Sequence, residues 1–253
     1  MNWDSVGTTF GTTTIIFAAL GFIAKNLVEL YFRVLDEKSK ANRALRTASA
    51  ERVREEVVRW AGPVSRSVEG LQKRLRNILF GYAYPALALD RQLPRGWSIR
   101  YDYFLPSTTY YFCQYFCWIR LFEEELNFEL FKKEESKDRF FKLVHGAAHK
   151  LSGYPLKELN DTPGKIDDKQ IFTLEQRLLG EILVIAKDGE TRCMSYAEFL
   201  DRWDDPQFKK RLGPIVEFLD GLNPDHECRW RRLLLLSEAL AELEAECRKL
   251  LSV

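Results

Sequence analysis

The sequence predicts an all-α protein in which an N-terminal transmembrane helix continues into a cytoplasmic multi-helix bundle. Three observations support this prediction: an uncharged apolar run near the N-terminus, a basic segment directly after it, and apolar positions at helical spacing through most of the remaining chain. Hydrophobic residues make up 46% and charged residues 30% of the 253 positions. These proportions are typical of a folded protein and exclude a disordered or collagen-like chain.

The predicted membrane anchor covers residues 10–32. Residues 10–24 carry no charge, but as a helix they would span only about 22 Å of the roughly 30 Å of a bilayer core. The extension to residue 32 includes Lys25 and Glu29, which must reach the membrane surface or pack against protein. A signal peptide is disfavoured because residues 1–10 contain Asp4 and no lysine or arginine. The alternative is a buried helix of a soluble protein.

The charge distribution sets the expected orientation of this anchor. Residues 25–76 contain 13 lysines and arginines against 7 acidic residues, whereas residues 77–253 contain 25 against 29. The positive-inside rule then predicts a single-pass protein of the plasma or inner membrane, with its N-terminus outside and the bulk of the chain in the cytoplasm. Five cysteines, an odd number, favour a reducing compartment. The side chains expected to contact lipid headgroups are Lys25, Arg33, Lys38, Lys40, Arg43 and Arg46.

Small residues recur on one face of the predicted anchor at alternating steps of four and three. Such a stripe lets two membrane helices approach closely, and association along it would shield Lys25 and Glu29 from lipid. The pattern indicates a homo-oligomer, with incidental small residues as the alternative. The stripe consists of Gly7, Gly11, Thr14, Ala18 and Gly21.

We divide the chain into the anchor (1–32), a basic juxtamembrane helix (33–62) and a helical cytoplasmic domain (63–253). Residues 25–60 contain no proline or glycine, and Gly62-Pro63 then indicates a helix end. Prolines and glycines predict loops over 84–106 and 152–168, and Ser107-Thr108 is a natural helix N-cap. Further helices are expected over 64–82, 107–131, 137–151, 170–187, 196–203, 206–219 and 227–251, with a short extended piece at 192–195.

Two of these helices have distinctive apolar patterns. Residues 110–122 are apolar on nearly every face but too short for a second membrane span, which predicts a buried central helix. Residues 233–250 carry leucines and Cys247 at heptad spacing, which favours docking within the bundle, with a partner-binding zipper as the alternative. In the central helix we expect burial of Tyr110, Phe112, Cys113, Phe116, Cys117 and Ile119.

Two pairs at helical spacing are weak candidates for metal ligands. His145 and His149 stand four residues apart, as do Cys113 and Cys117, and together they would supply the Cys2His2 donors of a zinc site. The general base of the HExxH pattern is missing, because Gly146 follows His145. An antiparallel pairing of the two helices would also offset the cysteines from the histidines by roughly 10 Å. We therefore expect polar packing of the histidines, buried thiols, and no metal or other cofactor.

The sequence contains no recognisable catalytic motif. The phosphate-binding loop, the dinucleotide glycine fingerprint and the nucleophile elbow are all missing, and the acidic groups at 123–125 and 201–205 are expected to be solvated or helix-terminal. A net charge of +1 gives no reason to expect nucleic acid. The leading hypothesis is a non-enzymatic, membrane-anchored interaction or sensor protein with an unknown protein partner. The alternatives are an oligomerising, membrane-perturbing effector, as in bacterial defence systems, and an anchored enzyme, whose sign would be a pocket with convergent ionisable groups.

Overall fold

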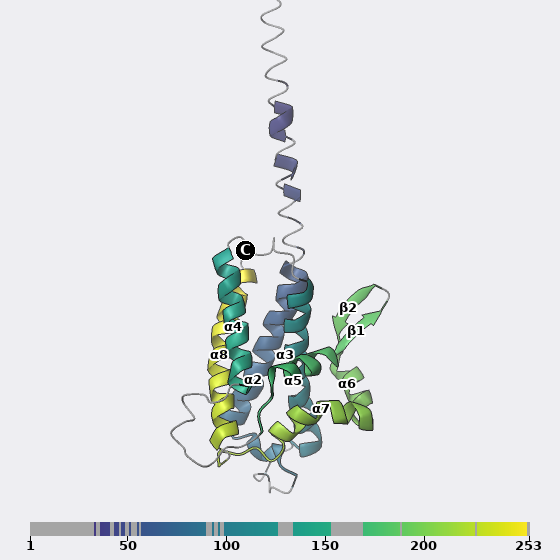
Figure 1. Ribbon diagram of the computed structural model, residues 1–253, viewed down its shortest axis with the longest axis vertical. Helices are drawn as coiled ribbons and strands as arrows, with labels where there is room; N and C mark the ends of the chain where they lie inside the picture. Colours follow the sequence, from purple (N-terminus) through teal and green to yellow (C-terminus); the bar gives the residue numbers. More distant parts are fainter. Residues whose placement is uncertain are drawn as a thin grey trace, which may run out of the picture. The chain divides into compact units, whose positions relative to one another are not determined.

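The computed structural model divides the chain into two compact units, Met1–Val53 and Arg54–Val253 (Figure 1). It describes residues 57–89, 99–125, 134–152, 169–187, 189–225 and 227–251, positions 93 and 96, and scattered positions between 33 and 55. In the first unit the described positions are helical. Across the described residues, none of the helices combines the length and the apolar character that a membrane crossing requires. The predicted anchor over residues 10–32 lies outside these residues.

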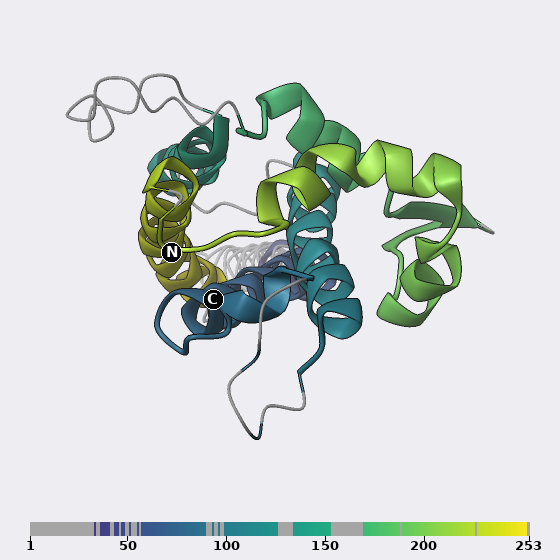
Figure 2. The ribbon, with the colours of Figure 1, turned by 90° about the horizontal axis from the view of Figure 1, so that it is seen from below.

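The second unit is mostly helical, as predicted. Figures 1 and 2 show four long helices side by side, with α8 between α2 and α4, and α2 between α8 and α3. The shorter α5 packs on α3 and reaches α4, while α6 and α7 cover another face of α3. The helices are α2 (Gly62–Leu79), α3 (Tyr101–Glu125), α4 (Glu134–Ser152), α5 (Thr173–Glu181), α6 (Tyr196–Trp203), α7 (Pro206–Leu219) and α8 (Glu227–Leu251).

The expected helix end at Gly62-Pro63 is wrong. A π-helical turn, η1 (Val57–Ala61), leads directly into α2, and Ala61 keeps helical dihedral angles of −69° and −31°. Pro63 is tolerated because it lies in the first turn of α2, where a backbone N–H has no intrahelical partner. The helix ends at Leu79, earlier than the predicted residue 82, and Tyr82 adopts a left-handed φ of 53°.

Helix α3 begins at Tyr101, six residues before the predicted N-cap, and contains Pro106. In the described residues of the segment predicted as a loop, a short 3₁₀ turn, η2 (Tyr84–Leu87), precedes α3. Next to Pro106, the Ser107 and Thr108 hydroxyls act within the helix, since both donate to the carbonyl of Phe104 (3.2 and 2.6 Å). The predicted burial is confirmed for Tyr110, Phe112, Cys113, Phe116 and Cys117, whereas Ile119 is half-buried.

The predicted helix over 170–187 is wrong in its C-terminal part. It ends at Glu181, and an antiparallel hairpin follows, with β1 (Val184–Lys187) paired to β2 (Glu190–Cys193). Asp-Gly between two short apolar segments is a hairpin signal, because the type of turn that it forms needs positive φ angles. Gly189 has a φ of 80°. The short extended piece expected at 192–195 overlaps β2 at residues 192–193, and this hairpin is the departure from an all-α fold within the described residues.

Helix α8 places its heptad positions inside the bundle. Leu233, Leu236, Leu240 and Leu243 are fully buried between α2 and α4, which confirms docking within the chain. Two buried arginines of α8 cap the C-terminal ends of other helices, where carbonyl groups lack intrahelical partners. They are Arg229, which donates to the carbonyls of Phe218 and Asp220 at 3.1 Å, and Arg232, which donates to that of Lys150 at 3.1 Å.

Candidate functional site

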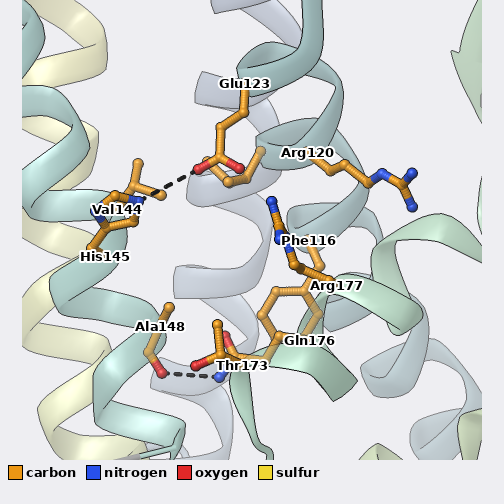
Figure 3. A pocket seen from close by; sticks show the side chains of 10 residues that line it. Phe116, Arg120, Glu123, Val144, His145, Ala148, Thr173, Gln176 and Arg177 are labelled. Atoms are coloured by element: carbon orange, nitrogen blue, oxygen red, sulfur yellow. Dashed lines mark hydrogen bonds and ion pairs between the residues drawn. The ribbon is translucent and has the colours of Figure 1, made fainter.

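A cleft of about 310 Å³ opens between α3, α4 and α5 (Figure 3). Its lining combines apolar side chains with several charged or polar groups from the three helices. A pocket with convergent ionisable groups is the usual form of a small-molecule site, and this volume lies at the small end of such sites. The lining residues are Phe116, Ile119, Arg120, Glu123, Val144, His145, Ala148, Thr173, Gln176 and Arg177.

Helix α5 holds the two sides of the cleft in place. Gly180 brings α5 so close to α3 that a Cβ atom at this position would lie 2.8 Å from the carbonyl carbon and oxygen of Phe116. On the other side, the buried Gln176 amide donates to the Ala148 carbonyl of α4 at 2.9 Å and to the Ile171 carbonyl at 2.8 Å. Because α5 contacts both helices, it closes one end of the space between them.

The charged side chains of the cleft differ in their pairing. Arg120 pairs with Glu124 at 2.8 Å and with Glu181 at 2.9 Å, and its side chain points away from the cleft in Figure 3. The Glu123 carboxylate lies 3.8 Å from His145 Nε2. Arg177 forms no ion pair with any described residue, and its guanidinium points toward Glu123 across the cleft. An anionic and a cationic group therefore face each other without contact.

The surroundings of Glu123 change its acidity. Burial raises the pKa of its carboxyl above the ordinary value of 4.5, and the charges of His145 and Arg177 offset this effect only in part. Residues 123–125 were expected to be solvated or helix-terminal charges. Glu123 does lie in the last turn of α3, but its side chain is only 28% exposed and faces the cleft. A carboxyl with a raised pKa in a cleft is typical of a functional site.

The four weak candidates for metal ligands do not come together. Cys113 and Cys117 are buried in the core on α3, whereas His145 and His149 are exposed on α4. His145 instead faces Glu123, with 3.8 Å between its Nε2 atom and the carboxylate. No group of three His, Cys, Asp or Glu side chains among the described residues has the geometry to hold a metal ion.

The cysteines of the core are poor nucleophiles. Burial raises the pKa of the Cys113 thiol, and a hydrogen bond with Cys117 together with burial raises that of Cys193 at the end of β2. The thiolate is the reactive form of cysteine, so these thiols stay protonated near neutral pH.

The structure describes only part of the predicted membrane-proximal residues. Arg33, Lys38, Lys40 and Arg43 are exposed, and Lys40 pairs with Asp36 at 2.7 Å. The remaining headgroup candidates, Lys25 and Arg46, lie outside the described residues, and so does the whole stripe Gly7, Gly11, Thr14, Ala18 and Gly21.

Sequence reasoning missed the cleft because its residues come from three separate helices. Glu123, His145 and Arg177 have no fixed spacing along the chain, and each resembles an ordinary surface residue of an amphipathic helix. The one local signal was Gly180 inside a helical pattern, since a glycine there often marks close backbone approach.

Comparison of the chain with protein-family models, with curated proteins and with solved structures gives no significant match.

Proposed function

We propose that this protein is a membrane-tethered sensor whose helical domain binds a small zwitterionic ligand in the cleft between α3, α4 and α5. The observation that carries the proposal is the pair Glu123 and Arg177, which face each other across the cleft. A ligand with an ammonium and a carboxylate group would pair with both, and each would be a charge-assisted hydrogen bond. Phe116 and Val144 offer an apolar wall for the body of the ligand.

The tether and the signalling output complete the proposal. Residues 10–32 would hold the protein in the membrane, and the basic residues from Lys25 to Arg46 would lie against anionic headgroups. Ligand binding would be passed on to a cytoplasmic protein partner. The cleft suits this role because a bound ligand would contact α3, α4 and α5 at the same time, so binding would act on the packing of all three helices.

Calorimetric titration of the full chain in detergent micelles tests the proposed ligand chemistry. The probes are L-phenylalanine, phenethylamine, which lacks the carboxylate, and 3-phenylpropanoate, which lacks the ammonium group. We expect L-phenylalanine to bind about ten- to a hundredfold more tightly than either analogue, since each charged contact contributes about 1.5–3 kcal/mol and 1.4 kcal/mol is a factor of ten. Equal affinity for all three probes, or binding of none of them, would refute the proposal.

Two substitutions assign the contacts. Glu123→Gln should remove the advantage of L-phenylalanine over 3-phenylpropanoate, and Arg177→Gln should remove its advantage over phenethylamine. Arg211→Gln is the matched control, because Arg211 is exposed on α7 and does not line the cleft. Binding that is unchanged in both cleft variants would place the ligand elsewhere.

An acid–base enzyme is a second candidate function. The raised pKa of Glu123 and its approach to His145 favour it, because a carboxyl near a histidine can exchange protons with a substrate. Recovery of the bound ligand distinguishes the two functions. A sensor releases its ligand unaltered, whereas an enzyme releases a product. The effector alternative depends on the stripe from Gly7 to Gly21, outside the described residues, so no observation here favours it.

A further inference from the structure

A second hollow of the helical domain lies on another face of α4. It is a groove of about 650 Å³ between α4 and α8, and its floor is formed by apolar or small residues of both helices. The floor consists of Leu143, Gly146, Leu235 and Ala239. At Gly146 an added Cβ would meet no atom within 4 Å, so the floor has free space above it.

The two edges of the groove carry opposite charges. Lys142 and Lys150 stand on the α4 edge, and Glu238 and Glu242 stand on the α8 edge. None of these four side chains forms an ion pair with another described residue, in contrast to Arg139, which pairs with Glu246 at 3.3 Å. The groove therefore has one basic edge and one acidic edge, both available to a partner.

We propose that this groove is a self-association surface, which packs against α4 and α8 of a second copy of the chain. The basic edge of each copy contacts the acidic edge of the other. The partner is a second copy because this surface is complementary to itself, as a two-fold interface requires. The proposal is independent of the ligand proposed for the cleft.

The direction of the helices selects the arrangement of the two copies. The Arg139–Glu246 ion pair and the hydrogen bond from Arg232 to the Lys150 carbonyl show that α4 and α8 run antiparallel. A two-fold axis perpendicular to the helices would stack α4 on α4 and bring like charges together, which is unfavourable. An axis parallel to the helices places α4 of one copy on α8 of the other, and opposite charges meet.

The parallel axis also fixes which residues meet. Since rotation about it keeps every residue at its level along the groove, Lys142 of one copy lies opposite Glu242 of the other. Lys150 comes within about one helical turn of Glu238, a step that a lysine side chain can bridge. Leu143 of one copy faces the small Ala239 of the other, where its side chain has room. Both α2 helices then begin at the same end of the dimer, as attachment to one membrane requires.

Carbodiimide crosslinking of the full chain in detergent micelles tests the pairing, because this reagent joins a lysine to a carboxylate only when they are in contact. Equal amounts of nitrogen-14 and nitrogen-15 chains are mixed first, so a peptide with one light and one heavy half must come from two copies. We expect a mixed light–heavy link between Lys142 and Glu242. If this link is found only within one isotope, or not at all, the proposal is wrong, even if the chains dimerise through another segment.

Charge reversal gives a second, independent readout. The acidic variant (Lys142→Glu, Lys150→Glu) has no cation among the four positions, and the basic variant (Glu238→Lys, Glu242→Lys) has no anion. For each variant alone, the amount of dimer that forms through the groove should fall by about tenfold or more. All four contacts between the edges of the two copies are then repulsive. A mixture of the two should restore it, since the edges of one copy are then acidic and those of the other basic. Restoration also shows that both variants fold.

The matched control reverses the same number of charges elsewhere. Lys210→Glu with Arg211→Glu changes two exposed positions of α7, outside the groove. This variant should form the Lys142–Glu242 link as the parent does. Variants of the groove that dimerise like the parent when alone, or a mixture that fails to recover the dimer, would each overturn the proposed pairing of α4 with α8.

Discussion

Glu123 and Glu198 have the same type of side chain, but their surroundings shift the pKa of the carboxyl in opposite directions. Glu198 lies in the first turn of α6, where Arg192 donates two hydrogen bonds (2.8 and 2.6 Å) and the Ser195 backbone N–H donates a third (2.8 Å). These donors hold the pKa of its carboxyl well below the ordinary range. Burial has the opposite effect on Glu123, whose pKa is raised. The partners of each carboxyl, rather than its residue type, decide its role.

Replacement of Glu123 by glutamine should raise the thermal unfolding temperature at pH 7. A carboxyl with a raised folded-state pKa is destabilising when ionised, so removing its charge stabilises the fold above that pKa. The gain should shrink as the pH falls through the raised pKa and vanish below the ordinary value of 4.5, where the carboxyl is protonated in both states. Calorimetric scans from pH 3 to pH 8 measure this difference.

Glu124→Gln is the control for this prediction. Glu124 is the neighbouring residue, but it is exposed and pairs with Arg120 at 2.8 Å. The substitution removes an exposed ion pair, so it should leave the unfolding temperature unchanged or lower it slightly. An equal gain in both variants would mean that general charge reduction, and not the burial of Glu123, is the cause.

Local signals in the sequence could locate some of these residues and not others. The Ser195–Glu198 pair follows the capping-box pattern, because the two side chains that satisfy each other's backbone groups are three positions apart. Glu123 and Arg177 lie far apart in the chain, and only the packing of α3 and α5 brings them to face each other. Their role depends on tertiary distance, which no local pattern contains.

At the scale of elements, the errors of sequence reasoning have a common cause. Gly62-Pro63, Pro106 and Asp188-Gly189 each permit more than one local structure, and the surrounding packing selects one. The π turn before α2 and the helical dihedral angles of Ala61 carry the chain past Gly62-Pro63. Helices with strong apolar periodicity and clear caps were predicted correctly, as for α6, α7 and α8.

Gly180→Ala tests the role of α5 in forming the cleft. The added methyl group would lie 2.8 Å from backbone atoms of Phe116, so α5 must move away from α3. We expect the free energy of unfolding to fall by about 1–3 kcal/mol, as overpacking in a core typically costs. Urea denaturation followed by circular dichroism measures the change.

The same substitution at Gly146 should have the opposite sign. Gly146 is also helical, but an added Cβ meets nothing within 4 Å, so alanine only improves helix propensity, by about 0.5–1 kcal/mol. A loss of stability in both variants, or in neither, would contradict the close contact of α5 with α3.

At the scale of the molecule, the sequence predicted a helical domain with a buried central helix, and both are found. Apolar side chains that face a helical core recur at helical spacing in the sequence, so the bundle could be predicted. The cleft and the groove could not, because each depends on where helices fail to fill the space between them. The predicted anchor, residues 10–32, lies outside the described part of the chain.

Alkaline carbonate extraction tests the anchor. We expect the full chain to stay with the membrane pellet, because residues 10–24 carry no charge and residues 10–32 are long enough, as a helix, to cross a bilayer core. Replacement of Gly11 and Ala18 by leucine should preserve this retention while blocking the close approach of two anchors. Release of the full chain into the supernatant would instead support a buried helix of a soluble protein.

Helix α4 lines the cleft with Val144, His145 and Ala148, and it lines the groove with Leu143 and Gly146. If both proposals hold, a single helix belongs to two binding equilibria, which thermodynamic linkage makes reciprocal. If a filled cleft strengthened pairing of two copies tenfold, pairing would strengthen ligand binding by the same factor, about 1.4 kcal/mol. The ligand concentration at which half of the clefts are filled would then fall as the concentration of the chains rises. The amount of the protein would therefore set the ligand concentration to which it responds.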